Sequence, residues 1–136
     1  MIFVTVGGQM PFDRLIRSVD TIAERKQESS FYAQIGFNGW RPKYMEWVEM
    51  LPPEVLRHKF RESTLIVAHA GMGTILTALD LKKKIVVLPR LGYLRETRND
   101  HQVATAIKLS EMGLVSYASD ETVLLEMISN PKSLDN

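Results

Sequence analysis

The sequence contains no cysteine, and this absence excludes several kinds of chemistry. Disulfide bonds, thiol nucleophiles and cysteine-ligated zinc sites all need a thiol that the chain does not have. A cysteine-free chain fits a cytoplasmic protein, and that is the localisation we expect. The histidines at positions 58, 69 and 101 do not lie three or four residues apart, so the sequence predicts no metal site.

Long apolar runs and an excess of one charge are also missing. No apolar stretch approaches the length of a membrane-spanning helix. The first residues lack the basic segment of a signal peptide and reach glycine at position 7, which predicts a first strand instead. With 17 basic and 16 acidic residues, the formal net charge is +1 and gives no electrostatic footprint for nucleic acid. We therefore expect a soluble chain that reaches a membrane only through a partner.

The sequence does contain a regular alternation of strand and helix patterns. Its 136 residues are the length of one domain, which we place at 1–129, with a disordered tail over 130–136. Short apolar runs predict strands over 2–6, 31–35, 64–69, 85–88 and 114–118. Helical spacing of apolar residues predicts helices over 12–23, 54–61, 73–81, 101–112 and 120–128. This order predicts an α/β fold, a single Rossmann-like domain whose parallel sheet carries helices on both faces.

Three loops with candidate ligand-binding residues follow strands of the predicted sheet. Gly7 and Gly8 follow the first strand, residues 69–74 follow the third, and the loop that begins at Pro89 follows the fourth. Ligands bind beyond the carboxyl ends of parallel strands, close to the point where the strand order changes direction. We therefore expect the three loops to share one rim.

The stretch from His69 to Thr74 turns from a buried strand into a helix. Gly71 and Gly73 let the backbone turn without Cβ clashes, so that the N–H groups of Met72, Gly73 and Thr74 can point at a ligand. Such a helix start attracts phosphate. The alternative is that the glycines only form a tight connection. His69 has no nucleophile and carboxylate placed to complete a triad, so we interpret it as a hydrogen-bonding histidine.

The polar residues Asn99, Asp100, His101 and Gln102 begin the helix predicted over 101–112. Asn99 or Asp100 can serve as its N-cap, with Gln102 as the capping-box partner of Asn99. Capping requires neither His101 nor the long loop before it, and loops of that length are more often functional than idle. We therefore expect His101 and Gln102 to hydrogen-bond sugar hydroxyls or a diphosphate.

Taken together, these motifs resemble the glycosyltransferase family 28 C-terminal domain over residues 2–118. The likeness is closest to small stand-alone members, the PssE-type subunits of exopolysaccharide synthesis and the nucleotide-sugar-binding subunit of the dolichol-linked N-acetylglucosaminyltransferase pair. The residues that carry the resemblance are Val4-Thr5-Val6-Gly7-Gly8 with Phe12-Asp13-Arg14-Leu15-Ile16, Val67-Ala68-His69-Ala70-Gly71-Met72-Gly73-Thr74, Val87-Leu88-Pro89-Arg90 and Asn99-Asp100-His101-Gln102.

The resemblance implies the donor half of a GT-B enzyme, an inverting hexosyltransferase that uses a UDP-sugar and no cofactor. The implied partner is a separate membrane-associated subunit that binds the acceptor, a polyprenyl-diphosphate-linked saccharide, and carries the catalytic base. Nucleic acid is not an expected partner. At matching positions, Gly7 and Gly8 would approach the diphosphate or the acceptor cleft, and residues 71–74 would hold the diphosphate.

The implied sugar-binding residues come from the last loop and the helix after it. His101 and Gln102 would contact the donor sugar, with Glu96 and Asn99 close by. One region departs from the family pattern. MurG-like relatives have a ribose-binding glutamate two or three residues beyond the position of Thr74, whereas this chain has leucine, threonine and alanine at 76–78. Ribose contact is therefore expected to be weaker or to come from elsewhere.

Two alternatives to a donor-binding subunit remain. A non-catalytic activator of a partner glycosyltransferase would fit the missing glutamate. A dinucleotide-binding Rossmann domain is disfavoured, because residues 6–11 do not have the spacing G-x-G-x-x-G.

Two apolar clusters are candidate surfaces for docking a partner, and the alternative for both is ordinary core. The first comprises Trp40, Tyr44, Met45, Trp47, Met50 and Leu51, and the second comprises Val123, Leu124, Met127 and Ile128.

Overall fold

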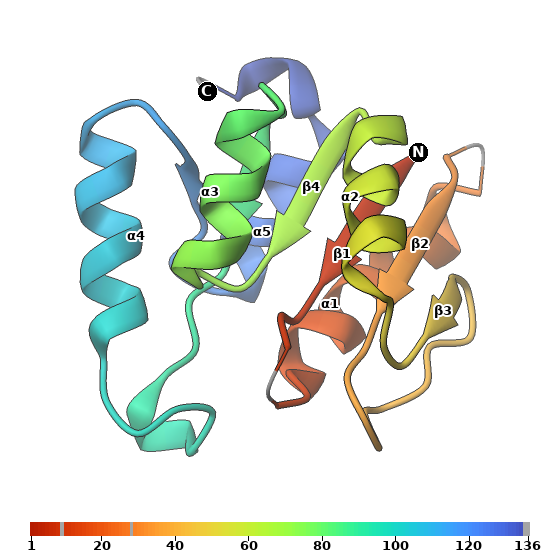
Figure 1. Ribbon diagram of the computed structural model, residues 1–136, viewed down its shortest axis with the longest axis horizontal. Helices are drawn as coiled ribbons and strands as arrows, with labels where there is room; N and C mark the ends of the chain where they lie inside the picture. Colours follow the sequence, from red (N-terminus) through yellow and green to blue (C-terminus); the bar gives the residue numbers. More distant parts are fainter. Residues whose placement is uncertain (9, 28, 135–136) are drawn as a thin grey trace.

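A parallel sheet of six strands forms the centre of the computed structural model, which describes residues 1–8, 10–27 and 29–134 (Figure 1). The strand order is β3-β2-β1-β4-β5-β6, and all five neighbouring pairs are parallel. This confirms the predicted α/β Rossmann-like class. The strands are β1 Ile2–Thr5, β2 Phe31–Gln34, β3 Glu46–Val48, β4 Leu65–Ala68, β5 Ile85–Val87 and β6 Ser116–Tyr117.

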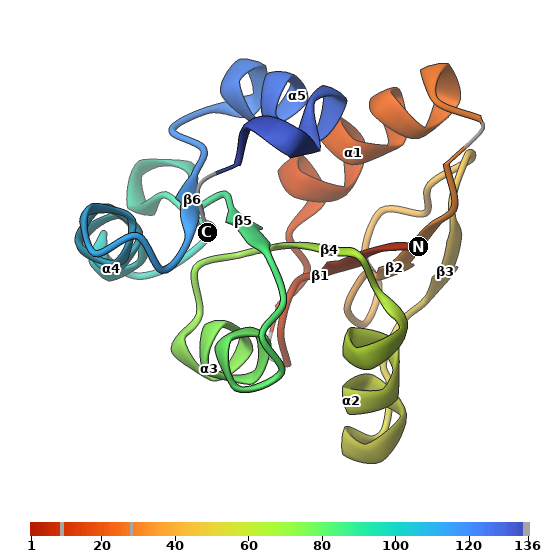
Figure 2. The ribbon, with the colours of Figure 1, turned by 90° about the horizontal axis from the view of Figure 1, so that it is seen from above.

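Helices cover both faces of the sheet, as predicted (Figure 2). Helices α1 and α5 pack together on one face, α2 and α3 lie on the other, and α4 packs near β6 at one end of the sheet (Figure 2). None of the helices in the described part of the chain is long and apolar enough to cross a membrane. Their bounds are α1 Asp13–Arg25, α2 Pro53–Glu62, α3 Met72–Asp80, α4 His101–Glu111 and α5 Glu121–Ser129, with short 3₁₀ helices at Gly92–Leu94 and Pro131–Ser133.

The continuous apolar character of the strands follows from the two cores that they separate. Successive side chains of a strand point to opposite faces. In β1, Val4 belongs to the core under α1 and α5, whereas its neighbour Phe3 belongs to the core under α2 and α3. Both side chains are fully buried. Each strand therefore needs apolar residues at consecutive positions, which is the pattern that predicted a parallel sheet.

The strand order changes direction between β1 and β4. From β1 the chain adds β2 and β3 on one side, then returns to place β4 on the other side of β1. The register pairs Thr5 with Ala68, so both strands end at the same level. Their carboxyl ends form the topological switch point, where a crevice for a ligand is expected.

Strand β3 was missing from the elements predicted from the sequence. It is a short strand at the edge of the sheet, and it pairs only with β2. Glu46 and Trp47 are exposed and Val48 is half-buried, so the segment shows no buried apolar pattern. Because edge strands are covered less than central ones, periodicity gave no signal here.

The ordered chain extends beyond the boundary predicted at residue 129. Pro131–Ser133 forms a 3₁₀ helix, and the side chain of Leu134 is buried in the core under α1 and α5. Burial of this apolar side chain offsets the entropy lost on ordering the segment, so the described structure continues past residue 129 as far as Leu134, and the boundary between domain and tail stays a prediction. Residues 135–136 lie outside the described part of the chain.

Two of the four residues in the second candidate docking cluster are core. Leu124 and Ile128 are fully buried between α5 and its neighbours, so a charge there would test folding rather than docking. In the first cluster, Met45 is also buried. Tyr44 and Trp47 remain available, with 47% and 36% of their surfaces exposed.

Candidate functional site

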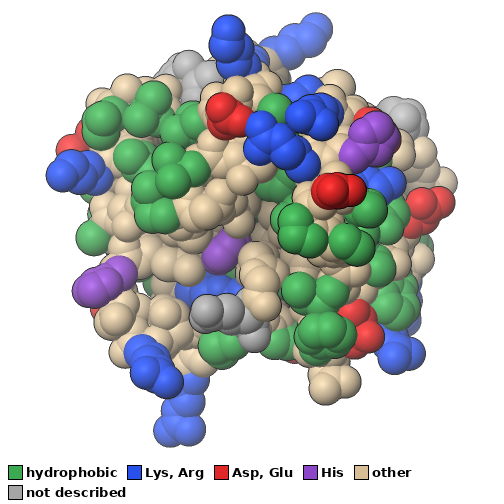
Figure 3. Space-filling view, in the orientation of Figure 1, with side chains coloured by type: hydrophobic (Ala, Val, Ile, Leu, Met, Phe, Trp, Pro, Cys, Tyr) green, Lys and Arg blue, Asp and Glu red, His purple; other side chains and the backbone are tan. Residues whose placement is uncertain are grey.

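A cavity of about 300 Å³ opens at the carboxyl ends of β1, β4 and β5. Figure 3 shows this face of the molecule hollowed near its centre, with histidine and basic side-chain atoms visible inside. The three loops selected from the sequence meet here, which confirms that they share one rim. The predicted residues that line the cavity are Gly7, Gly8, His69, Gly71, Gly73, Thr74, Glu96 and Gln102.

Three predicted site residues do not line this cavity: Met72, Asn99 and His101. Met72 lies in the first turn of α3 with 47% of its surface exposed. His101 is exposed at the start of α4, and the Asn99 side chain accepts a hydrogen bond from its backbone N–H at 3.0 Å. The cavity also has lining residues that sequence reasoning missed, namely Val6, Met10, Arg90 and Thr97.

A second cavity, of about 220 Å³, adjoins the first. Both cavities are lined by Gly7, Gly8, Gly73 and Thr74, so the start of α3 borders both. The remaining walls of the second cavity are mainly apolar and come from the segment after β3 and from α2, which carry no recognisable motif, with single polar residues from β1, β2 and α3. They comprise Met50, Leu51, Leu56 and Phe60, with the polar residues Thr5, Gln34 and Thr77.

The imidazole of His69 lies between Gly7 and Gly71. A Cβ atom at Gly7 would lie 2.4 Å from His69 Nε2, and one at Gly71 would lie 2.2 Å from His69 Cε1. Gly7 also has a φ of +84°. These two glycines therefore make room for the histidine, a reason that the sequence did not reveal. At Gly8 and Gly73, by contrast, a Cβ would meet nothing within 4 Å, so open space adjoins their backbone.

Substitution of Gly71 by alanine is expected to destabilise the protein by about 1–3 kcal/mol, because the new methyl group overpacks the imidazole of His69. Urea denaturation measures this loss. Gly73→Ala is the matched control, because it adds the same methyl group next to open space and is expected to be neutral or slightly stabilising. Equal stability of the two variants would show that His69 does not set the requirement for glycine.

Gln102 connects the loops after β4 and β5. Its Oε1 accepts hydrogen bonds from the backbone N–H groups of Ala70, at 3.2 Å, and Arg90, at 3.0 Å. Its Nε2 lies 3.2 Å from Nδ1 of His69. The amide of Gln102 is thus used inside the site, and the capping-box alternative for this residue is wrong.

Arg90 joins the loop after β1 to the loop after β5. Only 5% of its surface is exposed. Its guanidinium donates to the backbone carbonyl groups of Val6 and Met10 at 2.7 Å, Pro11 at 2.9 Å and Glu96 at 3.3 Å. Burial lowers the pKa of Arg90, and the nearby Glu96 carboxylate opposes this shift. The arginine thereby ties the first loop to the loop after β5.

Glu96 is fixed by an ion pair with Arg14. Its Oε2 lies 2.9 Å from Arg14 Nε, and its Oε1 lies 3.0 Å from Arg14 Nη2. Oε1 also accepts from the backbone N–H of Leu91 at 3.0 Å. The carboxylate therefore shapes the last loop, in addition to lining the cavity.

The chemistry available in the site is that of hydrogen-bond donors around a neutral imidazole. Burial, and then the positive charge of Arg90, lower the pKa of His69 to about 4. The first N–H groups of α3, after Gly71, have no carbonyl partner within the helix, so they can donate hydrogen bonds to an anion. Within the described residues, no group of three or more histidine or acidic side chains is arranged to hold a metal ion.

The fold is Rossmann-like, and the cavity lies at its switch point, the place where such sheets generally bind ligands. The chain belongs to the glycosyltransferase family 28 C-terminal domain, which matches residues 1–133. A search of curated proteins gave no match.

Solved structures share the fold at low sequence identity. UDP-GlcNAc 2-epimerase from Neisseria meningitidis, bound to UDP-GlcNAc, is 16% identical with a TM-score of 0.67, over 98% of this chain and 37% of that one. The glycosyltransferase SnogD from Streptomyces nogalater is 21% identical with a TM-score of 0.60, over 98% and 36%. The solution structure of ALG13 is 20% identical with a TM-score of 0.68, over 98% and 86%. The chain thus spans little more than a third of the first two structures and most of ALG13.

Proposed function

We propose that this chain binds the donor of a glycosyltransferase, a UDP-sugar, across its two adjoining cavities. The observation that carries the proposal is the position of the first turn of α3, where Gly73 and Thr74 line both cavities. Free N–H groups at a helix start bind phosphate. A diphosphate placed there would have its nucleoside on one side and its sugar on the other. Membership of the glycosyltransferase family 28 C-terminal domain supports this assignment.

The two cavities differ in polarity, as do the flat base and the sugar at the two ends of a nucleotide-sugar. The second cavity, with Met50, Leu51 and Leu56 in its walls, offers apolar surface to a flat base. The first cavity offers the polar side chain of Thr97 to the sugar, whereas the amide of Gln102 is already hydrogen-bonded within the site. At the ribose, the hydroxyl of Thr77 already donates to the backbone carbonyl of Gly73 at 2.9 Å. We therefore expect weaker ribose recognition than a glutamate would give.

A separate subunit would supply the remainder of the enzyme. The chain covers 36% of SnogD and 37% of the epimerase, so both proteins contain substantial further chain. We propose that the missing half is a membrane-associated partner with the acceptor site and the catalytic base, and that transfer inverts the sugar. The acceptor would be a polyprenyl-diphosphate-linked saccharide at the cytoplasmic face of the membrane.

Isothermal titration calorimetry with UDP and UDP-sugars tests donor binding. We expect the full chain to bind UDP, and Gly73→Trp to abolish binding because the indole would fill the open space between the cavities. Met112→Trp is the control, since Met112 is 61% exposed after α4 and does not line either cavity. Failure of the wild type to bind UDP or any UDP-sugar at millimolar concentration, with the partner present, would refute the proposal.

The second candidate function is that of a non-catalytic activator, favoured by the absence of a glutamate at 76–78, the region where MurG-like relatives have a ribose-binding glutamate. The reconstituted pair separates the two candidates. A donor-binding subunit loses turnover when Gly73→Trp blocks its cavities, whereas an activator keeps it.

A further inference from the structure

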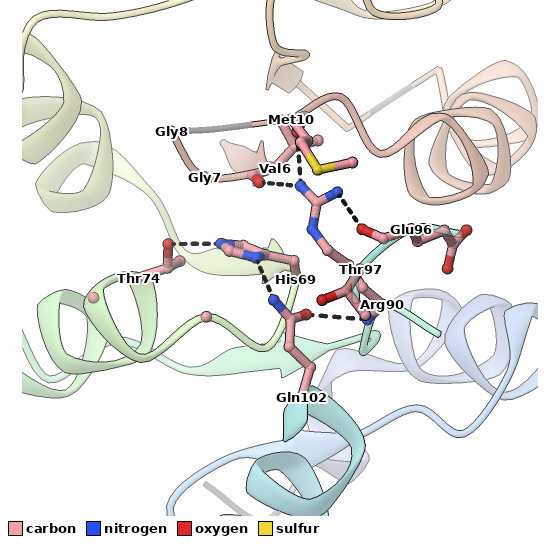
Figure 4. A pocket seen from close by; sticks show the side chains of 12 residues that line it. Val6, Gly7, Gly8, Met10, His69, Thr74, Arg90, Glu96, Thr97 and Gln102 are labelled. Atoms are coloured by element: carbon pink, nitrogen blue, oxygen red, sulfur yellow. Dashed lines mark hydrogen bonds between the residues drawn. The ribbon is translucent and has the colours of Figure 1, made fainter. Parts of the chain in front are cut away.

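The orientation of the Gln102 amide is determined by its backbone partners. A backbone N–H can only donate, so the amide atom that faces the N–H groups of Ala70 and Arg90 must be the oxygen. The amide nitrogen of Gln102 therefore faces His69 Nδ1, at 3.2 Å (Figure 4). An amide NH₂ group cannot accept a hydrogen bond, so it donates one to the imidazole.

This bond determines which ring nitrogen of His69 carries the proton. Nδ1 accepts from Gln102 and is therefore unprotonated. In a neutral imidazole the proton then lies on Nε2, which is 3.1 Å from Oγ1 of Thr74. Nε2–H donates to the threonine oxygen, and the proton of the Thr74 hydroxyl is left to point at another acceptor.

We propose that Gln102 is a positioning residue that acts through His69 to make the Thr74 hydroxyl a hydrogen-bond donor to the phosphate of the bound nucleotide. The proposal rests on the donor-binding function above. Thr74 lines both cavities, so its hydroxyl borders the expected diphosphate. With the other tautomer, Thr74 would have to donate to Nε2 and would present only lone pairs to an anion.

The hydrogen bonds that run from Gln102 through His69 to Thr74 form a relay. The surroundings of His69 hold its ring in the neutral form that this relay requires. The glycines at 7 and 71 enclose the ring, and α3 has no acidic residue in its first turn. The charged group that acts on the ring is Arg90, whose positive charge disfavours a positive charge on the imidazole. A protonated ring would also turn Nδ1–H toward the NH₂ group of Gln102, two donors facing each other. Burial together with Arg90 lowers the pKa of His69 to about 4, in agreement with this geometry.

Gln102→Glu reverses the direction of the hydrogen bonds in the relay and keeps the other contacts of this side chain. The carboxylate still accepts from the N–H groups of Ala70 and Arg90 but has no proton to donate, so it favours Nδ1–H in His69. Nitrogen-15 NMR of the histidine ring, recorded at pH 7.5 without ligand, is expected to show the Nε2–H tautomer in the wild type and protonated Nδ1 in the variant. Protonated Nδ1 in the wild type would overturn the proposal, and this measurement does not depend on nucleotide binding.

Calorimetry with UDP then measures the effect on the hydroxyl of Thr74. We expect Gln102→Glu to weaken UDP binding about tenfold, the typical effect of losing one hydrogen bond to a charged group. Ala104→Glu is the control for charge, because it adds a carboxylate at an exposed position of the first turns of α4. It is expected to weaken binding much less.

A double-mutant cycle with Thr74→Val separates the relay from simple repulsion. In the Thr74→Val background, which has no hydroxyl, Gln102→Glu is expected to lose most of its effect on UDP affinity. An undiminished effect there would overturn the proposal, because repulsion alone would then explain the loss. If the wild type bound no UDP at all, the donor-binding function would be refuted, and with it the hydrogen bond from Thr74 to phosphate. The effect of Gln102 on the tautomer of His69 would still be decided by the NMR measurement.

Discussion

Arg90→Met is expected to lower the free energy of unfolding by about 4 kcal/mol, since each buried carbonyl group that loses its donor costs about 1–3 kcal/mol. The arginine donates to four backbone carbonyl groups of two loops while almost wholly buried. Its guanidinium also lies 4.9 Å from the centre of the Phe12 ring, and methionine would keep only part of that contact. Urea denaturation at pH 7.5 provides the measurement.

Two further variants show whether the guanidinium itself is responsible. Arg98→Met removes the same charge from an exposed position of the same loop, and its effect is expected to stay within about 0.5 kcal/mol. Arg90→Lys is expected to fall between the two, because an ammonium group cannot reproduce the planar fork of donors. If Arg90→Met were as stable as Arg98→Met, the carbonyl contacts would not hold the loops together.

The importance of Arg90 could not be predicted from the sequence, although the residue stands in one of the quoted motifs. Its partners are backbone carbonyl groups, which every residue has, so no side-chain pattern identifies them. The same applies to Gly7 and Gly71. Their spacing with His69 is visible in the sequence, but the imidazole that fills the space between them is found only once β1 and β4 are paired.

The position of the site could be predicted, because it follows from topology. Continuous apolar strands indicate a parallel sheet, and the loops at its carboxyl edge then share one rim. The direction of individual side chains could not. His101 and Gln102 are neighbours at the start of α4, but consecutive residues of a helix point about 100° apart. Gln102 therefore lines the cavity, whereas His101 is exposed.

The fold alone does not identify the reaction that a protein catalyses. The epimerase from Neisseria meningitidis and the glycosyltransferase SnogD share this fold with the chain at TM-scores of 0.67 and 0.60, although one is an epimerase and the other a glycosyltransferase. The architecture therefore provides a ligand crevice and leaves the reaction open. Family membership narrows the choice to a glycosyltransferase domain, and the experiments with UDP and a reconstituted pair address the remainder.

Acidification is expected to destabilise the wild type by about 3 kcal/mol more than a His69→Gln variant between pH 7 and pH 4. The pKa of His69 is about 4 in the folded protein against an ordinary value of 6.5. Between these values the unfolded chain binds more protons than the folded one, so acid favours unfolding. The full contribution is present above pH 6.5 and is lost as the pH falls toward 4. Each pKa unit corresponds to about 1.4 kcal/mol, which sets the size of the effect.

Chemical denaturation at half-unit pH intervals, in the wild type and the variant, isolates this contribution from that of the carboxylates. Glutamine keeps an NH₂ group that can donate to Thr74 but does not titrate, so His69→Gln is expected to show a shallower fall in stability below pH 6.5. His58→Gln is the control, because His58 is exposed on α2 beside Glu62, and the variant should follow the wild-type curve far more closely. Parallel curves for the wild type and His69→Gln would mean that the imidazole between the two glycines titrates near its ordinary pKa, contrary to its burial beside Arg90.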